Sequence, residues 1–346
     1  MQAGPIRPPW YSPALTPQET ERAIRLIKEF FQTNLAFELN LMRVTAPIIV
    51  KAGTGINDDL NGIEKPVSFL IRGLDSEKVE IVQSLAKWKR MALAQLGIAH
   101  GHGLYADMNA IRPDETLDSL HSLYVDQWDW ERVISNEERT VEFLKAIVRK
   151  IYDVIRRTER YIAYRYEPIT SILPDSITFV HSEELQARYP GLTPREREYQ
   201  ICREHGAVFI IGIGSALQDG VPHDGRAPDY DDWSTPSVNG FRGLNGDIIV
   251  YYPLLDCAFE LSSMGIRVDA EALLKQLEIR QVLERRDLLF HRRLLAGELP
   301  LSIGGGIGQS RLCMLYLRKA HIGEIQASIW PDEMVAECAK SNIFLL

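Results

Sequence analysis

The chain has 346 residues, of which 45% are hydrophobic and 25% are charged. This balance excludes a disordered chain, and the sequence contains no apolar run near the roughly 20 residues that a membrane span needs. With 39 Lys and Arg against 47 Asp and Glu, the net charge of −8 disfavours a nonspecific grip on nucleic acid.

The four cysteines are far apart and lack the spacing of a metal site. This spacing is typical of reduced cysteines that pack in the interior of a cytoplasmic protein. We therefore expect a globular cytoplasmic enzyme that binds neither membranes nor nucleic acid.

The N-terminal end is rich in proline and has no apolar signal core. We expect a mobile extension over residues 1–15, followed by a single catalytic domain over residues 16–346. Thr16-Pro-Gln-Glu19 is a capping box that predicts the start of a helix. The apolar run over residues 39–50 then predicts a strand that enters the core.

Short β-rich runs separated by turns predict an antiparallel sheet. They cover residues 66–71, 78–84, 103–111, 122–130, 177–180, 207–212, 247–252 and 257–263. Ser135-Asn-Glu-Glu138 is a second capping box and predicts the start of a long amphipathic helix. Helices are also expected over residues 270–298, so the fold class is α+β: a mostly antiparallel mixed sheet flanked by helices.

The stretch Ser84-Leu-Ala-Lys-Trp-Lys-Arg90 mixes helix formers with three cations, which is typical of a solvated charged face. The stretch Gly304-Gly-Gly-Ile-Gly-Gln-Ser-Arg311 leads from an apolar run into a helix. Glycines admit close backbone approach and a helix N-terminus attracts anions, so this stretch suits a nucleotide. A closely packed turn from strand to helix explains the glycines equally well.

A hairpin joins Asp247 to Glu260. If its turn is centred between Pro253 and Leu254, the two acids face each other directly and repel, unless a divalent cation lies between them. A bulge that shifts the register would instead leave both in solvent. Farther upstream, Gln127 and Asp129 share a strand face with Val125, which predicts a cavity wall.

Four runs resemble the second and third signature motifs of class II aminoacyl-tRNA synthetase catalytic domains. They are Arg112-Pro-Asp-Glu115, Asp126-Gln-Trp-Asp-Trp130, Glu260-Leu-Ser-Ser-Met-Gly-Ile-Arg267 and the glycine stretch. Three further runs, Ser84 to Arg90, Arg226-Ala-Pro-Asp-Tyr-Asp-Asp-Trp-Ser-Thr-Pro236 and Leu244-Asn-Gly-Asp247, make the closer match. Together these runs are similar to the ammonia-dependent aspartate-ammonia ligase family, asparagine synthetase type A.

The resemblance implies a homodimer that uses ATP and Mg²⁺ to convert L-aspartate and ammonia into L-asparagine, AMP and pyrophosphate through a β-aspartyl adenylate. It places Arg112 between the α-phosphate and the activated carboxylate, and Arg311 at the distal phosphates or adenine. Arg226, Glu260, Gly306 and Gly308 are expected at the nucleotide, and Asp247 and Glu260 at the metal.

The same resemblance assigns residues to aspartate and ammonia. Ser84, Lys89, Ser263 and Arg267 are expected to bind the aspartate carboxylates, and Asp129 and Asp231 its ammonium group. Asp58 and Gln127 are expected where nitrogen enters, with Asp58 favouring ammonium and helping to remove its proton.

Three alternatives stay open. An aspartyl- or asparaginyl-tRNA synthetase usually adds an anticodon-binding domain, which the matched pattern does not contain. A glutamine-dependent enzyme needs a cysteine after the first methionine, where this chain has Gln2. A non-catalytic paralogue that binds an amino acid or adenylate is expected to have lost the arginines or the metal carboxylates.

Overall fold

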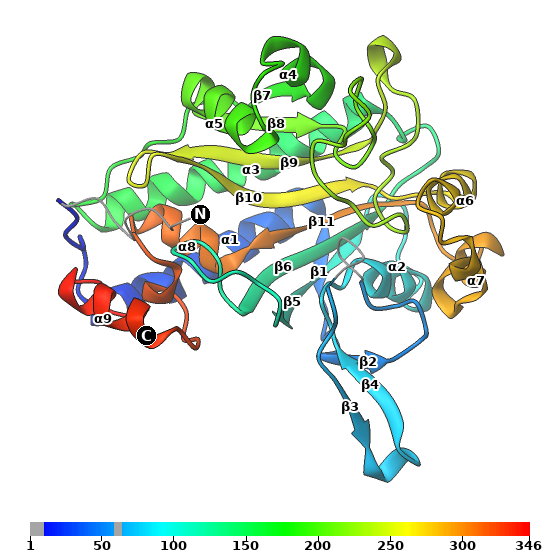
Figure 1. Cartoon of the computed structure of the whole chain (residues 1–346), viewed down its shortest axis with the longest axis horizontal. Coiled ribbons are helices and arrows are strands. Elements are labelled where there is room, and N and C mark those ends of the chain that lie inside the picture. Colours follow the sequence, from blue (N-terminus) through cyan, green and yellow to red (C-terminus); the bar gives the residue numbers. More distant parts are fainter. Residues whose placement is uncertain (1–9, 59–63) are drawn as a thin grey trace.

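A mixed β-sheet runs through the molecule (Figure 1). Helices pack on one of its faces, and the other face carries a cleft. The computed structural model describes residues 10–58 and 64–346. Residues 1–9 of the expected mobile extension lie outside the described residues. Tyr11 and Leu15 differ from the expected extension, because both are buried and Tyr11 Oη donates to Glu324.

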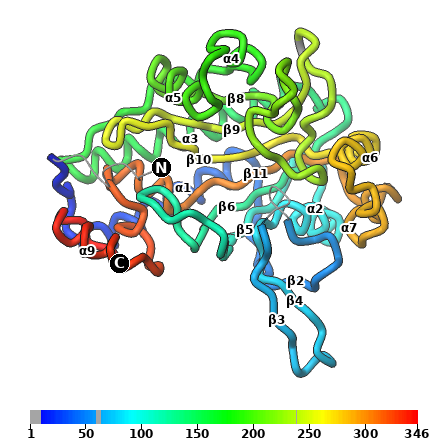
Figure 2. Tube along the Cα trace, viewed as in Figure 1, coloured from blue at the N-terminus to red at the C-terminus, as the bar shows by residue number. Residues whose placement is uncertain are grey.

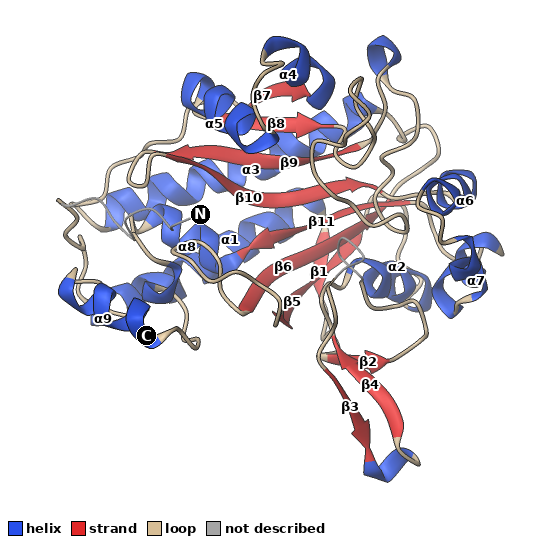
Figure 3. Ribbon diagram, in the orientation of Figure 1, coloured by secondary structure: helices blue, strands red, loops and turns tan. Residues whose placement is uncertain are grey.

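In the described part of the chain, eight strands form the main sheet in the order β1-β5-β6-β11-β10-β9-β8-β7 (Figure 3). Their bounds are β1 Leu41–Arg43, β5 Gly103–Ile111, β6 Tyr124–Val133, β7 Thr178–His181, β8 Ala207–Ile211, β9 Asn245–Tyr252, β10 Cys257–Ile266 and β11 Ser302–Gly308. Neighbouring strands are antiparallel except for the parallel pairs β1–β5 and β7–β8. The expected α+β fold with a mostly antiparallel mixed sheet is confirmed.

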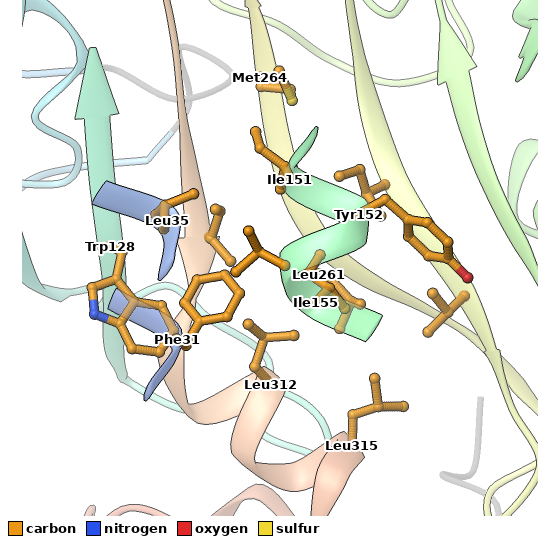
Figure 4. Packing of buried hydrophobic residues seen from close by; sticks show 14 of the residues in the cluster. Phe31, Leu35, Trp128, Ile151, Tyr152, Ile155, Leu261, Met264, Leu312 and Leu315 are labelled. Atoms are coloured by element: carbon orange, nitrogen blue, oxygen red, sulfur yellow. The ribbon is translucent and has the colours of Figure 1, made fainter. Parts of the chain in front are cut away.

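Three helices cover the packed face: α1 Pro17–Leu39, α3 Val141–Arg165 and α8 Gln309–Tyr316. Their apolar stripes meet the alternate residues of β6 and β10 in one core. Phe31 of α1 lies against Trp128 of β6, with ring centroids 4.6 Å apart (Figure 4). Burying such aromatic and branched side chains supplies the main favourable term in folding.

The remaining helices are α2 Ala86–Gln95, α4 Ser182–Arg188, α5 Pro194–His205, α6 Ala270–Ile279, α7 Leu289–Leu295 and α9 Asp332–Lys340. Among them, α2 packs against β5, β6 and β11, and α5 packs against β8, β9 and β10. Helices α2, α6 and α7 pack together at one end of the molecule. A separate sheet of β2 Ile49–Lys51, β3 Ser68–Ile71 and β4 Glu77–Ile81 projects from the body as an arm (Figure 2).

The prediction of a single strand over residues 39–50 is wrong. Helix α1 continues to Leu39 and ends at Asn40, whose positive φ of 55° turns the chain. The next residues form β1 in the main sheet, whereas Ile49–Lys51 belongs to the arm. The apolar run therefore serves two different sheets.

The second capping box does not begin a helix. Glu138 accepts a hydrogen bond from Ser135 N at 2.9 Å, but the segment forms a turn. Helix α3 begins at Val141, because Thr140 Oγ1 accepts from Phe143 N at 3.1 Å. The predicted apolar face of the helix is nevertheless buried as expected.

We expect Thr140→Ala to lower the free energy of unfolding by about 1 kcal/mol, because the side chain satisfies an otherwise unpaired helix amide. Ser135→Ala is the matched control, and we expect it to change that free energy by less than about 0.5 kcal/mol. Urea denaturation followed by circular dichroism measures both values. Equal losses would mean that the helix depends on Ser135 as much as on Thr140.

Candidate active site

A cleft of ≈ 380 Å³ lies on the open face of the sheet, above β6, β11 and β10. Most of the residues predicted for the site line it: Asp58, Ser84, Arg112, Gln127, Asp129, Arg226, Asp231, Glu260, Ser263, Arg267, Gly306, Gly308 and Arg311. Lys89 and Asp247 are not on its wall but are buried beside it. Residues that are widely separated in the chain therefore share one cavity.

The glycine stretch forms the floor of this cleft. Gly304 and Gly306 lie inside strand β11, between β6 and β10, and not in a turn. A methyl group at Gly304 would overlap the carboxylate of Glu131, and one at Gly306 would overlap the amide of Gln127. Glycine is required here because side chains of β6 occupy the space above β11. Contact between these glycines and a nucleotide stays a prediction.

The N-terminus of α8 already has an acidic partner. Asp126 of β6 accepts a hydrogen bond from Ser310 N at 3.0 Å, and Lys28 Nζ lies 3.3 Å from the other carboxylate oxygen. The positive end of the helix is thus met by a carboxylate of the protein. Sequence reasoning missed this role of Asp126, and nothing local in its strand indicated it.

A network of charged side chains is buried under the aspartate-binding end predicted for the cleft. Arg267 donates from Nε and Nη2 to Glu131, at 3.0 and 2.9 Å, and from Nη1 to Asp231. Lys89 Nζ lies 2.7 Å from Asp129 Oδ1 and 3.9 Å from Glu131 Oε2. Each charge is therefore compensated, as buried charges must be.

Burial and pairing act against each other in this network. Burial alone would raise the pKa of Glu131, but Arg267 and Lys89 outweigh it and hold the pKa below its usual value. Burial lowers the pKa of Lys89 in spite of Asp129 and Glu131. Glu131 was missed by sequence reasoning, although it continues the alternation of Gln127 and Asp129 along the same strand face.

The solvated charged face predicted for residues 84–90 is wrong. Lys87, Lys89 and Arg90 are all buried, because α2 lies against β6 and the ends of the neighbouring segments. Lys87 Nζ contacts Asp229 at 2.9 Å, and Arg90 donates to the carbonyl oxygens of Val268 and Pro300. The three cations hold the helix to surrounding segments.

The arginines of the cleft differ in their partners. Arg226 pairs with Asp247, and Arg311 Nη1 donates to Glu260 O at 2.9 Å. Arg112 is different: among the described residues its guanidinium has no ion-pair partner, and its buried Nε has no hydrogen-bond partner. Its position in the cleft wall and its unpaired charge suit an anionic ligand.

The direct opposition predicted for Asp247 and Glu260 is wrong. A bulge between Glu260 and Ser262 shifts the register, so Asp247 pairs with Ser263 and Glu260 with Ile249. The bulge does not leave both acids in solvent, because Asp247 is buried whereas the Glu260 side chain is 47% exposed. Burial raises the pKa of Asp247 to about 8 against the pull of Arg226, and Glu260 adds to the rise.

The donor set limits which metal would fit here. Within residues 10–58 and 64–346, no group of three or more His, Cys, Asp or Glu side chains is placed to hold a metal ion. Mg²⁺ commonly uses one or two carboxylates and takes its other ligands from water and substrate phosphates. Asp247 and Glu260 fit that pattern: burial is the main cause of the raised pKa of Asp247, and a cation would offset the smaller contribution from Glu260.

Asp58 is buried in the segment that follows β2, and it lines the cleft. Asn57 Oδ1 accepts from both Asp58 N and Gln83 N, at 3.0 and 2.9 Å, and Gln83 Nε2 donates to Asp58 O. Tyr230, another cleft residue, has a pKa well above its usual value because it is buried and because Asp58 is close. The carboxylate of Asp58 thus lies near the phenol of Tyr230.

Comparison with known proteins identifies close relatives. A family model described as aspartate-ammonia ligase matches residues 18–342. Relatives named aspartate–ammonia ligase from Parabacteroides distasonis and Bacteroides thetaiotaomicron are each 59% identical over 341 residues, covering 99% of this chain and 99% of the relative. One from Clostridium perfringens is 57% identical over 339 residues, covering 98% of both chains.

The solved structures with a similar fold are synthetases. Asparaginyl-tRNA synthetase from Pyrococcus horikoshii, complexed with asparaginyl-adenylate, aligns with a TM-score of 0.66 at 15% identity, over 90% of this chain and 70% of that one. The Entamoeba histolytica asparaginyl-tRNA synthetase aligns with a TM-score of 0.62 at 15% identity, over 90% of this chain and 67% of that one. The expected class II catalytic fold is confirmed.

We expect Glu131→Gln to lower the free energy of unfolding by about 3 kcal/mol or more, because it leaves buried positive charge uncompensated. Glu142→Gln is the control: Glu142 is 70% exposed in its ion pair with Lys145 and should contribute far less. Urea denaturation of the two variants makes the comparison. Similar small losses would show that the buried network adds little to stability.

Proposed function

Because the chain belongs to the aspartate-ammonia ligase family, we propose that its cleft joins L-aspartate to free ammonia at the expense of ATP. The products are L-asparagine, AMP and pyrophosphate, and the route passes through a β-aspartyl adenylate. The observation that carries this function is the 59% identity over 99% of the chain. The geometry of the cleft supports the separate roles proposed for its residues in activating aspartate, binding it and admitting ammonia.

The first half-reaction is activation. A carboxylate resists attack by a nucleophile, so the β-carboxylate of aspartate first displaces pyrophosphate from the α-phosphate of ATP. Arg112 stabilises the charge that develops there, since its guanidinium is not neutralised by an acid of the described chain. Arg311 and Arg226 line the same cleft and contact the remaining phosphates or the adenine.

Aspartate binds at the opposite end, beside Arg267. Glu131 and Asp231 hold this guanidinium, so it is oriented before the substrate arrives. Ser84, Ser263 and Arg267 hold the carboxylates, and Asp129 and Asp231 hold the ammonium group. Lys89 Nζ donates a hydrogen bond to Asp129 and so fixes the position of that carboxylate. Direct contact between Lys89 and aspartate stays a prediction.

Ammonia enters beside Asp58 and Gln127. Ammonium must lose a proton before it can attack the adenylate, and a carboxylate both attracts the cation and accepts that proton. Burial of Asp58 and the nearby phenol of Tyr230 keep the position dry and polar. Gln127 projects over Gly306 on the cleft floor and borders the same space.

Asp247 and Glu260 would hold Mg²⁺ together with phosphate oxygens of ATP. When bound, the ion would offset negative charge on the phosphates. Arg226 pairs with Asp247 and would help to orient its carboxylate toward the ion.

We further propose a cytoplasmic homodimer. The four cysteines are free thiols, which suits a reducing compartment. Phe37 of α1 and Tyr164 of α3 are 80% and 87% exposed on neighbouring helices, and exposed aromatic side chains are typical of subunit interfaces. Within the described residues no helix is long and apolar enough to cross a membrane.

Sedimentation velocity measures the subunit number, and a monomer would contradict the homodimer.

The function is tested by measuring pyrophosphate and asparagine with the purified protein, ATP and Mg²⁺. We expect asparagine to form with aspartate and ammonium, and activity to disappear when EDTA removes the metal. Glutamine in place of ammonium should not support turnover, and added tRNA should not be charged. Ammonium-independent charging of tRNA would favour the synthetase alternative, and no pyrophosphate under any condition would favour a binding protein.

The two half-reactions should separate in two variants. Arg112→Ala should reduce aspartate-dependent ATP–pyrophosphate exchange by about 10²–10³, because it removes a charge that stabilises the transition state. Asp58→Ala should spare the exchange and slow asparagine formation. Steady-state kinetics with ammonium as the varied substrate completes the comparison. Equal loss of both half-reactions in Asp58→Ala would remove this residue from the ammonia step.

A further inference from the structure

A buried polar cluster lies behind the part of the cleft wall that carries Asp58. Lys87 Nζ of α2 lies 2.9 Å from Asp229 Oδ2, and His291 Nε2 of α7 lies 3.0 Å from the same oxygen. All three side chains are at most 2% exposed. Arg285 Nη1 is farther away, at 4.0 Å from that oxygen. None of these residues lines the cleft.

The protonation of the cluster fixes the histidine ring. Burial would raise the pKa of Asp229, but Lys87 and His291 outweigh it and hold the pKa well below its usual value. A carboxylate only accepts hydrogen bonds, so Nε2 of His291 carries the proton that is shared with Asp229. The opposite nitrogen, Nδ1, is buried without a hydrogen-bond partner.

The loop that leads to Asp58 rests on this ring. A methyl group at Gly55 would lie 2.9 Å from His291 Nδ1 and 2.9 Å from Leu288 Cβ, so the backbone at Gly55 is in contact with α7. Next to it, Phe290 N donates to Thr54 O at 3.3 Å. On the other side, Asn57 Oδ1 of the loop accepts from Gln83 N, and Gln83 Nε2 donates to Asp58 O.

The loop thus contacts α7 at Gly55, three residues before Asp58, and Gln83 at Asn57 and Asp58. Asp229 belongs to the same segment as Arg226 and Asp231, and Lys87 belongs to the same helix as Lys89. The cluster therefore ties the Asp58 loop to two other segments that build the cleft. Because a displacement of about 1 Å can cost an enzyme on the order of 10²-fold in rate, this tie has a kinetic consequence.

We propose that His291, held by Asp229, is a positioning residue for the ammonia step. It touches no substrate and acts through the backbone of Gly55, which sets where the Asp58 carboxylate lies. A change at Gly55 should affect adenylate formation much less, because Gly55 contacts His291 from the Asp58 loop, whereas Arg112 lies on a different segment after β5. The proposal rests on the ammonia-step role proposed for Asp58.

The chain offers a matched pair of substitutions to test it. Gly53 and Gly55 have nearly the same positive φ, +72° and +71°, but a methyl group at Gly53 meets nothing within 4 Å. Gly53→Ala therefore adds similar backbone strain without contacting α7. We expect Gly55→Ala to lower kcat/KM for ammonium roughly ten- to a hundredfold while ATP–pyrophosphate exchange stays within about threefold of the unsubstituted protein.

The outcomes are distinct. Equal effects of Gly53→Ala and Gly55→Ala on kcat/KM for ammonium, or a loss of exchange as large as the loss of amidation, would overturn the proposal. A second pair covers poor folding of Gly55→Ala: His291→Ala should reproduce the ammonium defect, and His291→Gln, whose amide can still donate to Asp229, should recover most of it. No defect in His291→Ala, or no recovery in His291→Gln, would also overturn it.

A parallel measurement separates this inference from the function on which it rests. If Asp58→Ala leaves kcat/KM for ammonium unchanged, the proposed role of Asp58 fails. If Asp58→Ala lowers it while Gly55→Ala and His291→Ala do not, only the positioning role of His291 fails.

Discussion

Charges that are removed from water need partners of opposite sign, and this requirement organises the floor of the cleft. Glu131 lies between Arg267 and Lys89, so one carboxylate joins β6, the residue that follows β10, and α2. Its side chain fills the space above β11, which is why Gly304 carries no side chain. The glycine strand is therefore a consequence of the ion network as much as a way to admit a ligand. Asp229 plays a comparable part behind the wall, where it joins α2 to α7.

The same fold accommodates tRNA synthetases and this family, so the sheet alone does not select the acceptor of the adenylate. The selection has to come from the residues around the reacting carboxyl group. At one side the described chain presents paired arginines and a single unpaired one, Arg112. At the other it presents a buried acid, Asp58, on a loop that is held from behind. A small basic nucleophile suits that acid better than a bulky sugar hydroxyl does.

Local patterns predicted most of the strands and the packed faces of α1 and α3, because alternation and helical periodicity reflect which face is buried. Most of the residues that share the cleft were predicted from the family resemblance. They failed where the outcome depends on distant partners. Lys87 and Arg90 have the composition of a surface, and only Asp229, Val268 and Pro300, far along the chain, make their burial possible. The box at Ser135 closes a turn because Thr140 provides a competing cap. The role of Glu131 depended on Arg267, which is equally distant in sequence.

The bulge in β10 has a consequence for how this cleft can vary among related proteins. On one side of it Ser263 and Arg267, odd positions, face the cleft, whereas on the other side the even position Glu260 does so and Phe259 turns into the core. The strand therefore consists of two segments whose inward and outward phases are independent. The bulge absorbs one extra residue, so loss of that residue would leave both segments facing as they do now, and substitutions on one segment leave the phase of the other untouched. The ends of the cleft proposed for the nucleotide and for the amino acid can thus diverge separately while they share one strand.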